Sequence, residues 1–152
     1  MTELTRAQQL GARESGLAVA ITMRATGSPR ASVVNAGVLD HPVTGQPVVG
    51  FVSRGMAHKL TDIRERPQAT VVFRSGWEWI AVEGNAELAG PLDPLAGLAM
   101  AEVPRLLRTV YAAAVGGSSD DWAGLDESMA REGHTAVLVR AVRVYPTSDP
   151  AS

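Results

Sequence analysis

The sequence predicts a mainly β fold in which six strands form an antiparallel sheet closed on itself, with helices flanking it. Two observations predict this fold. Most strand-like segments follow one another across short turns, and the helical segments are too few and too late to supply a crossover between every pair of strands. The expected element order is α-βββ-α-ββ-αα-β in one domain of 152 residues, a length that suits a single core.

The N-terminal third is expected to form one helix and three strands. Leu4, Ala7 and Leu10 share one face of a helix over residues 1–15, and Gly16 ends that helix. Turns that contain glycine and proline then separate three expected strands, Leu17–Met23, Arg30–Leu39 and Val48–Ser53. Short turns of this kind favour antiparallel pairing of the strands that they join.

The middle of the chain is expected to form a short helix and two more strands. Met56, Leu60 and Ile63 recur on one helical face after Gly55, and Pro67 ends the helix. The two strands are expected over Gln68–Phe73 and Trp79–Leu88. We expect Glu83 and Glu87 to lie in solvent, and Arg64 and Arg66 to complement only the negative end of the helix dipole.

The C-terminal third is expected to form two helical segments and a last strand. Asp93 is the expected N-cap and Pro94 the first residue of a helical region that reaches about Val115, with Pro104 dividing it. The remaining elements are a helix over Asp121–Arg131 and a strand over Ala136–Tyr145. The stretch 116–119 is the expected loose loop, and residues 146–152 form an expected frayed tail.

Composition narrows the classes of function. The formal net charge is −2, with no basic tail and no Lys/Arg run, so we expect no nucleic-acid partner. No apolar run approaches the roughly 20 residues of a membrane span, and the N-terminus lacks the apolar core of a signal peptide, so we expect a cytoplasmic protein. Cysteine is absent, which excludes disulfides, thiolate metal sites and thiol nucleophiles.

Hydrolytic and metal chemistry also lack a sequence basis. The three histidines, His41, His58 and His134, are scattered, and neither a Gly-x-Ser-x-Gly elbow nor a His-Glu-x-x-His motif is present. The glycine patterns of dinucleotide and P-loop sites are missing as well. We therefore expect no catalytic side chain and no metal site, and we expect any chemistry to come from a cofactor.

The most informative segment is 52–60, where a strand ends, Gly55 turns the chain and a helix begins. Lys59 in this segment is the single lysine among 14 basic residues. Free backbone N–H groups, the positive end of the helix dipole and cationic side chains together favour a bound phosphate. The alternative is a solvated helix start whose charges pair locally with Asp62 and Glu65.

The stretch 54–87, RGMAHKLTDIRERPQATVVFRSGWEWIAVEGNAE, resembles the pyridoxamine 5'-phosphate oxidase-like, FMN-binding split-barrel superfamily. In that superfamily a strand leads into a helix that ends in Arg/Asn-x-Pro, and a Trp-containing turn and a Val-x-Gly-x-Ala strand follow. The branch it resembles most is the actinobacterial group of F420 (deazaflavin)-dependent reductases. Weaker similarity at 27–35 and 121–131 extends the resemblance to about Leu17–Tyr145.

The resemblance implies an obligate homodimer of six-stranded split β-barrels with two cofactor grooves along its interface. Lys59 matches the position that holds the cofactor's phosphate tail, and Arg54 is expected to compensate for Ala57, where the family commonly has a basic residue. Trp77 or Trp79 is expected either to wall the ring pocket across the dimer or to serve packing. Ser32, Val34 and Asn35 match positions beside the cofactor ring, and Ser53 and His58 match the strand end and helix start that wrap the phosphate tail. With Arg54, Met56, Lys59 and Trp77 they make up the expected cofactor-binding residues.

The function implied is transfer of a hydride between F420 and a small organic acceptor. Two alternatives stay open at this point: an FMN-dependent oxidoreductase on the same fold, and a non-catalytic protein that binds a flavin, a deazaflavin or a tetrapyrrole. The missing acid/base group discriminates poorly between these, because the reductases of the family also lack one.

Overall fold

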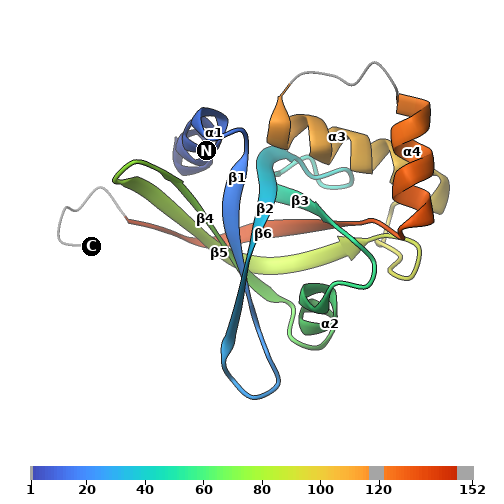
Figure 1. Cartoon of the computed structure of the whole chain (residues 1–152), viewed down its shortest axis with the longest axis horizontal. Helices are drawn as coiled ribbons and strands as arrows, with labels where there is room; N and C mark the ends of the chain where they lie inside the picture. Colours follow the sequence, from blue (N-terminus) through green and yellow to red (C-terminus); the bar gives the residue numbers. More distant parts are fainter. Residues whose placement is uncertain (1, 117–121, 147–152) are drawn as a thin grey trace.

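Six strands close into an antiparallel barrel in the order β1-β2-β3-β6-β5-β4 (Figure 1). The computed structural model describes residues 2–116 and 122–146. The strands are β1 (Leu17–Met23), β2 (Pro29–Asp40), β3 (Pro47–Ser53), β4 (Gln68–Ser75), β5 (Glu78–Ala89) and β6 (Thr135–Tyr145). The helices are α1 (Thr2–Arg13), α2 (His58–Glu65), α3 (Val103–Val115) and α4 (Trp122–Arg131), preceded at α3 by the 3-10 helix η1 (Met100–Glu102).

This architecture confirms the predicted antiparallel barrel and the predicted order of elements. The strand ends agree with the expected ones to within two residues. The expected tail after residue 146 and most of the expected loose loop, 117–119, lie outside the described residues.

The barrel interior is filled by alternate residues of each strand. Val71 and Phe73 of β4 are fully buried, and they lie opposite Val82 and Ile80 of β5, which are buried too. Because successive side chains of a strand point to opposite faces, the residues between them face outward. The alternation that predicted the strands therefore also places the core.

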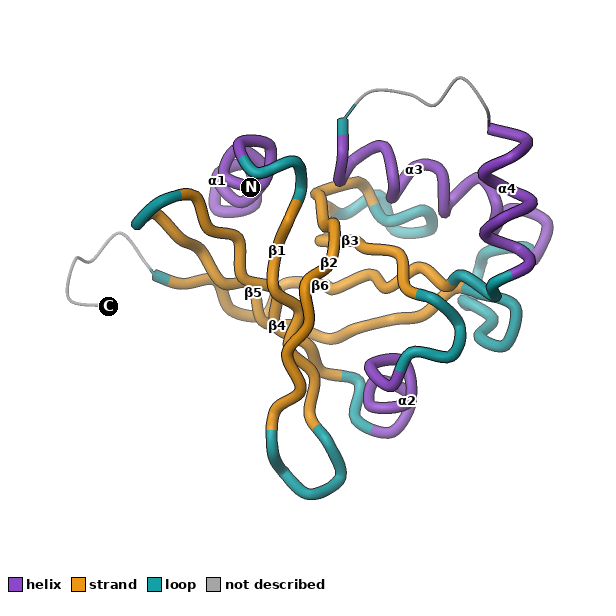
Figure 2. The backbone as a smooth tube through the Cα atoms, viewed as in Figure 1, coloured by secondary structure: helices purple, strands orange, loops and turns teal. Residues whose placement is uncertain are grey.

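The helices cover different parts of the barrel (Figure 2). The predicted apolar face of α1 is buried against β2 and β4. Helix α3 lies on β2 so closely that a Cβ added to Gly37 would meet the Ala113 carbonyl oxygen at 2.3 Å. Helix α2 lies away from both, beside the β1–β2 hairpin, and contributes Leu60 and Ile63 to the core.

The start of the α3 region differs from the expectation. Asp93 does not cap a helix at Pro94, because its backbone pairs with Gly90 and its carboxylate accepts two hydrogen bonds from Arg64. Pro104 does not divide a helix but lies in the first turn of α3, where a missing N–H costs nothing. The α-helix therefore begins at Val103, nine residues later than the Asp-Pro pair suggested.

Met56 is a second correction. Its side chain is 93% exposed, whereas Leu60 and Ile63, with which it was expected to share an apolar face, are buried. The reason is that α2 begins only at His58, so Met56 belongs to the preceding turn and does not follow the helical period.

No helix in residues 2–116 and 122–146 is long and apolar enough to cross a membrane.

Candidate functional site

The first turn of α2 has no cap. Its N-cap residue is Ala57, which has no side-chain oxygen to offer, and no acidic residue stands in the first turn. The backbone N–H groups of His58 and Lys59 donate no hydrogen bond to any other described residue. Since the first N–H groups of a helix carry its positive partial charge, this end of α2 is available to an anion.

Lys59 adds a full charge to this helix start. Partial burial, followed by the positive charge of Arg30, lowers the pKa of Lys59 from its usual value of 10.5. Lys59 makes no ion pair with a carboxylate in the described part of the chain. An anion placed between the two cations would be favoured by both charges, and it would return the pKa of Lys59 toward its usual value.

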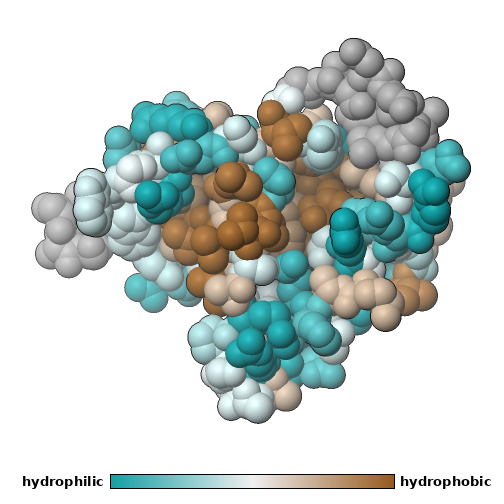
Figure 3. Space-filling view, in the orientation of Figure 1, coloured by the Kyte–Doolittle hydropathy of each residue, from teal (hydrophilic) through white to brown (hydrophobic). Residues whose placement is uncertain are grey.

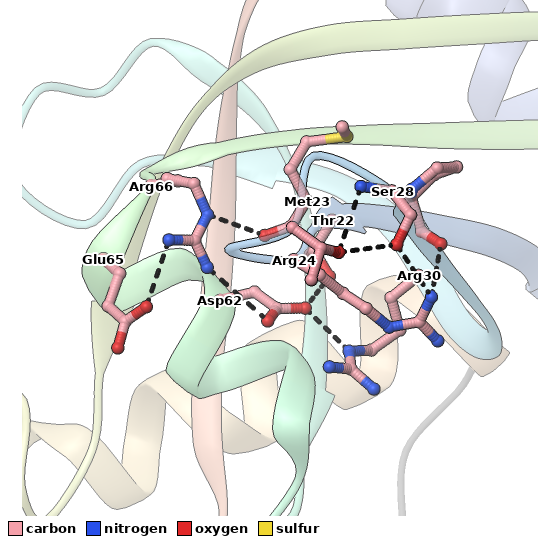
Figure 4. Close-up of polar contacts among 10 residues, drawn as sticks. Thr22, Met23, Arg24, Ser28, Arg30, Asp62, Glu65 and Arg66 are labelled. Atoms are coloured by element: carbon pink, nitrogen blue, oxygen red, sulfur yellow. Dashed lines mark hydrogen bonds and ion pairs between the residues drawn. The ribbon is translucent and has the colours of Figure 1, made fainter.

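Arg30 comes from β2 and is held beside α2 by Asp62. The Asp62 carboxylate is buried; its Oδ2 accepts a 2.7 Å hydrogen bond from Arg30 Nε and another of 2.7 Å from Thr22 Oγ1 (Figure 4). The hydrogen bond from Arg30 is the largest cause that lowers the pKa of Asp62, and burial opposes it. Asp62 is therefore an ionised anchor that fixes the end of the β1–β2 hairpin to α2.

Arg66 and Arg64 do more than face a helix dipole, which corrects the sequence-based expectation. Arg66 Nε donates to the Met23 carbonyl oxygen at 2.8 Å, and its Nη2 lies 3.9 Å from Asp62 Oδ1 (Figure 4). Arg64 binds Asp93 through two hydrogen bonds of 2.9 and 2.7 Å, and this pairing raises the pKa of Arg64. These contacts tie α2 to the β1–β2 hairpin on one side and to the segment after β5 on the other.

Two other residues expected around the phosphate have partners of their own. Ser53 is buried at the end of β3, and its hydroxyl donates to the Arg54 carbonyl oxygen at 3.3 Å. Arg54 is largely exposed and pairs with Glu132 at 3.2 Å. The arginine whose charge acts on Lys59 is thus Arg30, not Arg54.

The three residues expected beside the cofactor ring lie on both faces of β2. Ser32 and Val34 share the face of Arg30, where Ser32 is partly buried and Val34 is buried in the core. Asn35 faces outward, donates to the Ser15 carbonyl oxygen at 3.0 Å, and lines a cavity of about 310 Å³ that Arg54 also lines. The structure therefore brings Asn35 and Arg54 together at one cavity, whose described lining does not include Lys59.

Trp77 lies in the turn between β4 and β5 and is 99% exposed. That turn is at the opposite side of the barrel from α2 (Figure 1). Within one chain Trp77 and Lys59 cannot border one site. Trp79 packs edge-to-face on Tyr145, with ring centroids 6.1 Å apart.

An apolar area covers the outer face of the barrel around β1 (Figure 3). Val19 of β1 pairs with Val33 of β2, and both are exposed, as is Leu17. A contiguous exposed apolar surface of this kind is typical of a site that binds a partner molecule. Glu83 of β5 is engaged as well: its hydrogen bond with Tyr145 is the largest cause that raises the pKa of that phenol, so Glu83 is not simply solvated as expected.

Glu87 is also engaged. Its Oε1 lies 3.1 Å from His41 Nε2 and 3.5 Å from Arg140 Nη2, which corrects the expectation of a solvated side chain. His41 Nδ1 accepts hydrogen bonds from the Val43 and Thr44 backbone N–H groups, so His41 stabilises the β2–β3 turn.

Among the described residues no cluster of His, Asp or Glu could hold a metal ion.

No protein-family model and no curated protein sequence matches the chain. Solved structures do match over most of its length. A conserved hypothetical protein of Mycobacterium tuberculosis superposes with a TM-score of 0.68 at 18% identity, over 95% of this chain and 82% of that one.

Two further structures carry functional names. A pyridoxamine 5'-phosphate oxidase-related, FMN-binding protein of Nostoc punctiforme superposes with a TM-score of 0.64 at 16% identity, over 95% of this chain and 81% of its own. The heme storage protein of Vibrio cholerae gives a TM-score of 0.57 at 13% identity, over 95% and 92%. At these identities the comparisons establish that this chain shares the fold of those proteins.

Proposed function

We propose that this protein is a homodimeric oxidoreductase that binds a phosphorylated flavin-type cofactor, F420 or alternatively FMN, through Lys59 and the start of α2. The observation that carries the proposal is the Lys59–Arg30 pair of cations beside two backbone N–H groups that donate to no other described residue. A phosphoryl group is the ligand chemistry that such a combination suits best.

The fold supports the same proposal. One protein with this fold is described as FMN-binding and related to pyridoxamine 5'-phosphate oxidase. The resemblance of 54–87 to F420-dependent reductases favours the deazaflavin over FMN. When bound, either cofactor would supply hydride transfer to a small organic acceptor, a chemistry for which the described side chains need only orient the ring and exclude water.

The exposed apolar face around Val19 and Val33 supports the dimer. Pairing two barrels through this face would remove the apolar area from water. The turn that carries Trp77 and the helix that carries Lys59 lie on opposite sides of one barrel. Trp77 would therefore contact a cofactor only where that cofactor is bound at Lys59 of the partner chain. Asn35, Ser32, Ser53, His58 and Met56 remain proposed cofactor contacts.

The test is equilibrium binding of F420 and FMN, measured side by side with purified protein. We expect Lys59→Ala to weaken binding of the preferred cofactor by roughly 10- to 100-fold, the value of one charge-assisted hydrogen bond. Arg105→Ala, which removes an exposed arginine on α3, is the matched control and should leave the affinity unchanged. Unchanged affinity in Lys59→Ala would refute the site.

A second candidate is a non-catalytic binding protein. The likeness in fold to a heme storage protein favours it. Turnover of reduced F420 with quinones, enones and tetrapyrroles separates the two candidates, because a storage protein would bind hemin without oxidising the deazaflavin. Hemin binding that survives in Lys59→Ala, without turnover, would favour storage over reduction.

A further inference from the structure

A pocket of about 200 Å³ lies between α3, α4 and the segment that joins β5 to α3. Its apolar lining comes from Pro91, Met100, Val103, Pro104, Leu107 and Met129. Val103 and Leu107 are one helical turn apart on α3, and both are buried, as is Met129 of α4. Figure 1 shows α4 packed crosswise against α3 at this place.

The polar groups of the pocket are already compensated. Asp126 accepts two hydrogen bonds of 2.9 Å from Arg108, one to each carboxylate oxygen. His134 donates from Nδ1 to the Met129 carbonyl oxygen at 3.3 Å. A bound molecule would therefore meet no uncompensated charge, and a charged ligand would lose its hydration without gaining a partner.

The volume and the lining together select a ligand class. A cavity of 150 Å³ lined by apolar side chains is large enough to hold benzene. The pocket between α3 and α4 is somewhat larger, at about 200 Å³, which leaves space for one small substituent on the ring. Methionine sulfur makes favourable contacts with aromatic rings, and Met100 and Met129 are both in the lining.

We infer that this pocket binds a small, neutral, monocyclic aromatic molecule. The site is separate from the Lys59 region and needs no cofactor, so it goes beyond the proposed function. Met129 and His134 also line the cavity that contains Asn35 and Arg54, so these two side chains form the wall between the pocket and that cavity.

The methionine methyl groups report directly on this pocket. Protein labelled with [¹³C-methyl]methionine is titrated with toluene, and each resonance is assigned by a Met→Leu substitution. We expect saturable shifts at Met100 and Met129. Met56, which is 93% exposed and outside the pocket lining, is the internal reference and should not shift.

A blocking variant and two other ligands complete the test. Ala130 lines the pocket from an exposed position on α4, so Ala130→Phe should fill the pocket without disturbing the core and should abolish the shifts. The control is Ala12→Phe at an exposed position on α1, which should leave the shifts unchanged. Benzoate, which carries a charge, should bind at least roughly tenfold more weakly than toluene. Methylcyclohexane, which lacks the aromatic ring, should also bind more weakly than toluene. The inference is overturned by absent or non-saturable shifts, by shifts that persist in Ala130→Phe, or by equal binding of either comparison ligand.

Discussion

Arg30 Nε donates a 2.7 Å hydrogen bond to Asp62 Oδ2, and this contact joins β2 to α2 across 32 positions of sequence. The same carboxylate oxygen accepts from Thr22, so both strands of the β1–β2 hairpin are fastened at one buried point. The distance between Arg30 and Lys59 depends on this anchor. The charge distribution at the start of α2 is thus a consequence of tertiary structure.

The first prediction concerns the anchor itself. Asp62→Asn removes the charge while keeping the shape, and it leaves Arg30 without its anionic partner. We expect the free energy of unfolding to fall by about 3 kcal/mol, measured by urea denaturation. Glu65→Gln on the same helix removes an exposed carboxylate that pairs with Arg66, and it should cost no more than about 0.5 kcal/mol. Equal losses in the two variants would contradict the anchor.

The second prediction is the pH dependence of stability. The pKa of Asp62 is lower in the folded protein than its ordinary value of 3.8. A lowered carboxyl pKa gives stability that is fully present above the unfolded value and is lost as the pH falls through the folded value. The urea midpoint should therefore drop when the pH is lowered below about 4. The drop should be smaller in Asp62→Asn. Identical pH profiles of the two proteins would show that Asp62 does not cause the pH dependence.

The third prediction uses the single lysine of the chain. Protein labelled with [¹³C]lysine should give one set of side-chain resonances, and their pH titration reports the pKa of Lys59 alone. We expect a midpoint below 10.5, because burial and Arg30 both disfavour the charged form. Because Lys59 must keep its proton to bind an anion strongly, affinity for pyrophosphate should fall as the pH rises through this midpoint.

Two comparisons check that titration. Arg30→Gln removes the neighbouring charge and should move the midpoint upward, and saturating pyrophosphate should move it upward in the unmodified protein. A midpoint that neither change affects would show that Lys59 senses neither Arg30 nor an anion.

The fourth prediction concerns His41. Its Nδ1 accepts from two backbone N–H groups, so its Nε2 must carry the proton that faces Glu87 at 3.1 Å. His41→Phe would remove the two hydrogen bonds from the Val43 and Thr44 backbone N–H groups and the contact with Glu87, and it should lower the free energy of unfolding by about 2 kcal/mol. His41→Asn can still accept in the turn and should cost less. Thermal denaturation ranks the two, and the reverse order would contradict the assigned tautomer.

The strands could be predicted because their signal is local. Alternation on β5 and the turns between strands place each strand within two residues of its position in the structure. The late start of α3 could not be predicted from Asp93 and Pro94. The carboxylate of Asp93 has a stronger partner in Arg64, and that partner lies 29 positions earlier in the chain.

The candidate site shows the same division. The transition from β3 to α2 and the position of Lys59 at the start of that helix follow from the local sequence pattern around Gly55, and the structure has both. Arg30 was missed because its approach to Lys59 depends on the length of the β1–β2 hairpin and on Asp62. The burial of Asp62, which requires a cationic partner, would have pointed to Arg30, but that burial is visible only in the structure.

Ala57 leaves α2 without the hydrogen bonds that a serine or aspartate would give its first turn. Any bound anion would supply them, so occupancy and local order are coupled. In the empty protein the amides of His58 and Lys59 should exchange with deuterium quickly, and an occupant would slow that exchange. The absence of a cap thus makes the beginning of this helix a reporter of its own ligand.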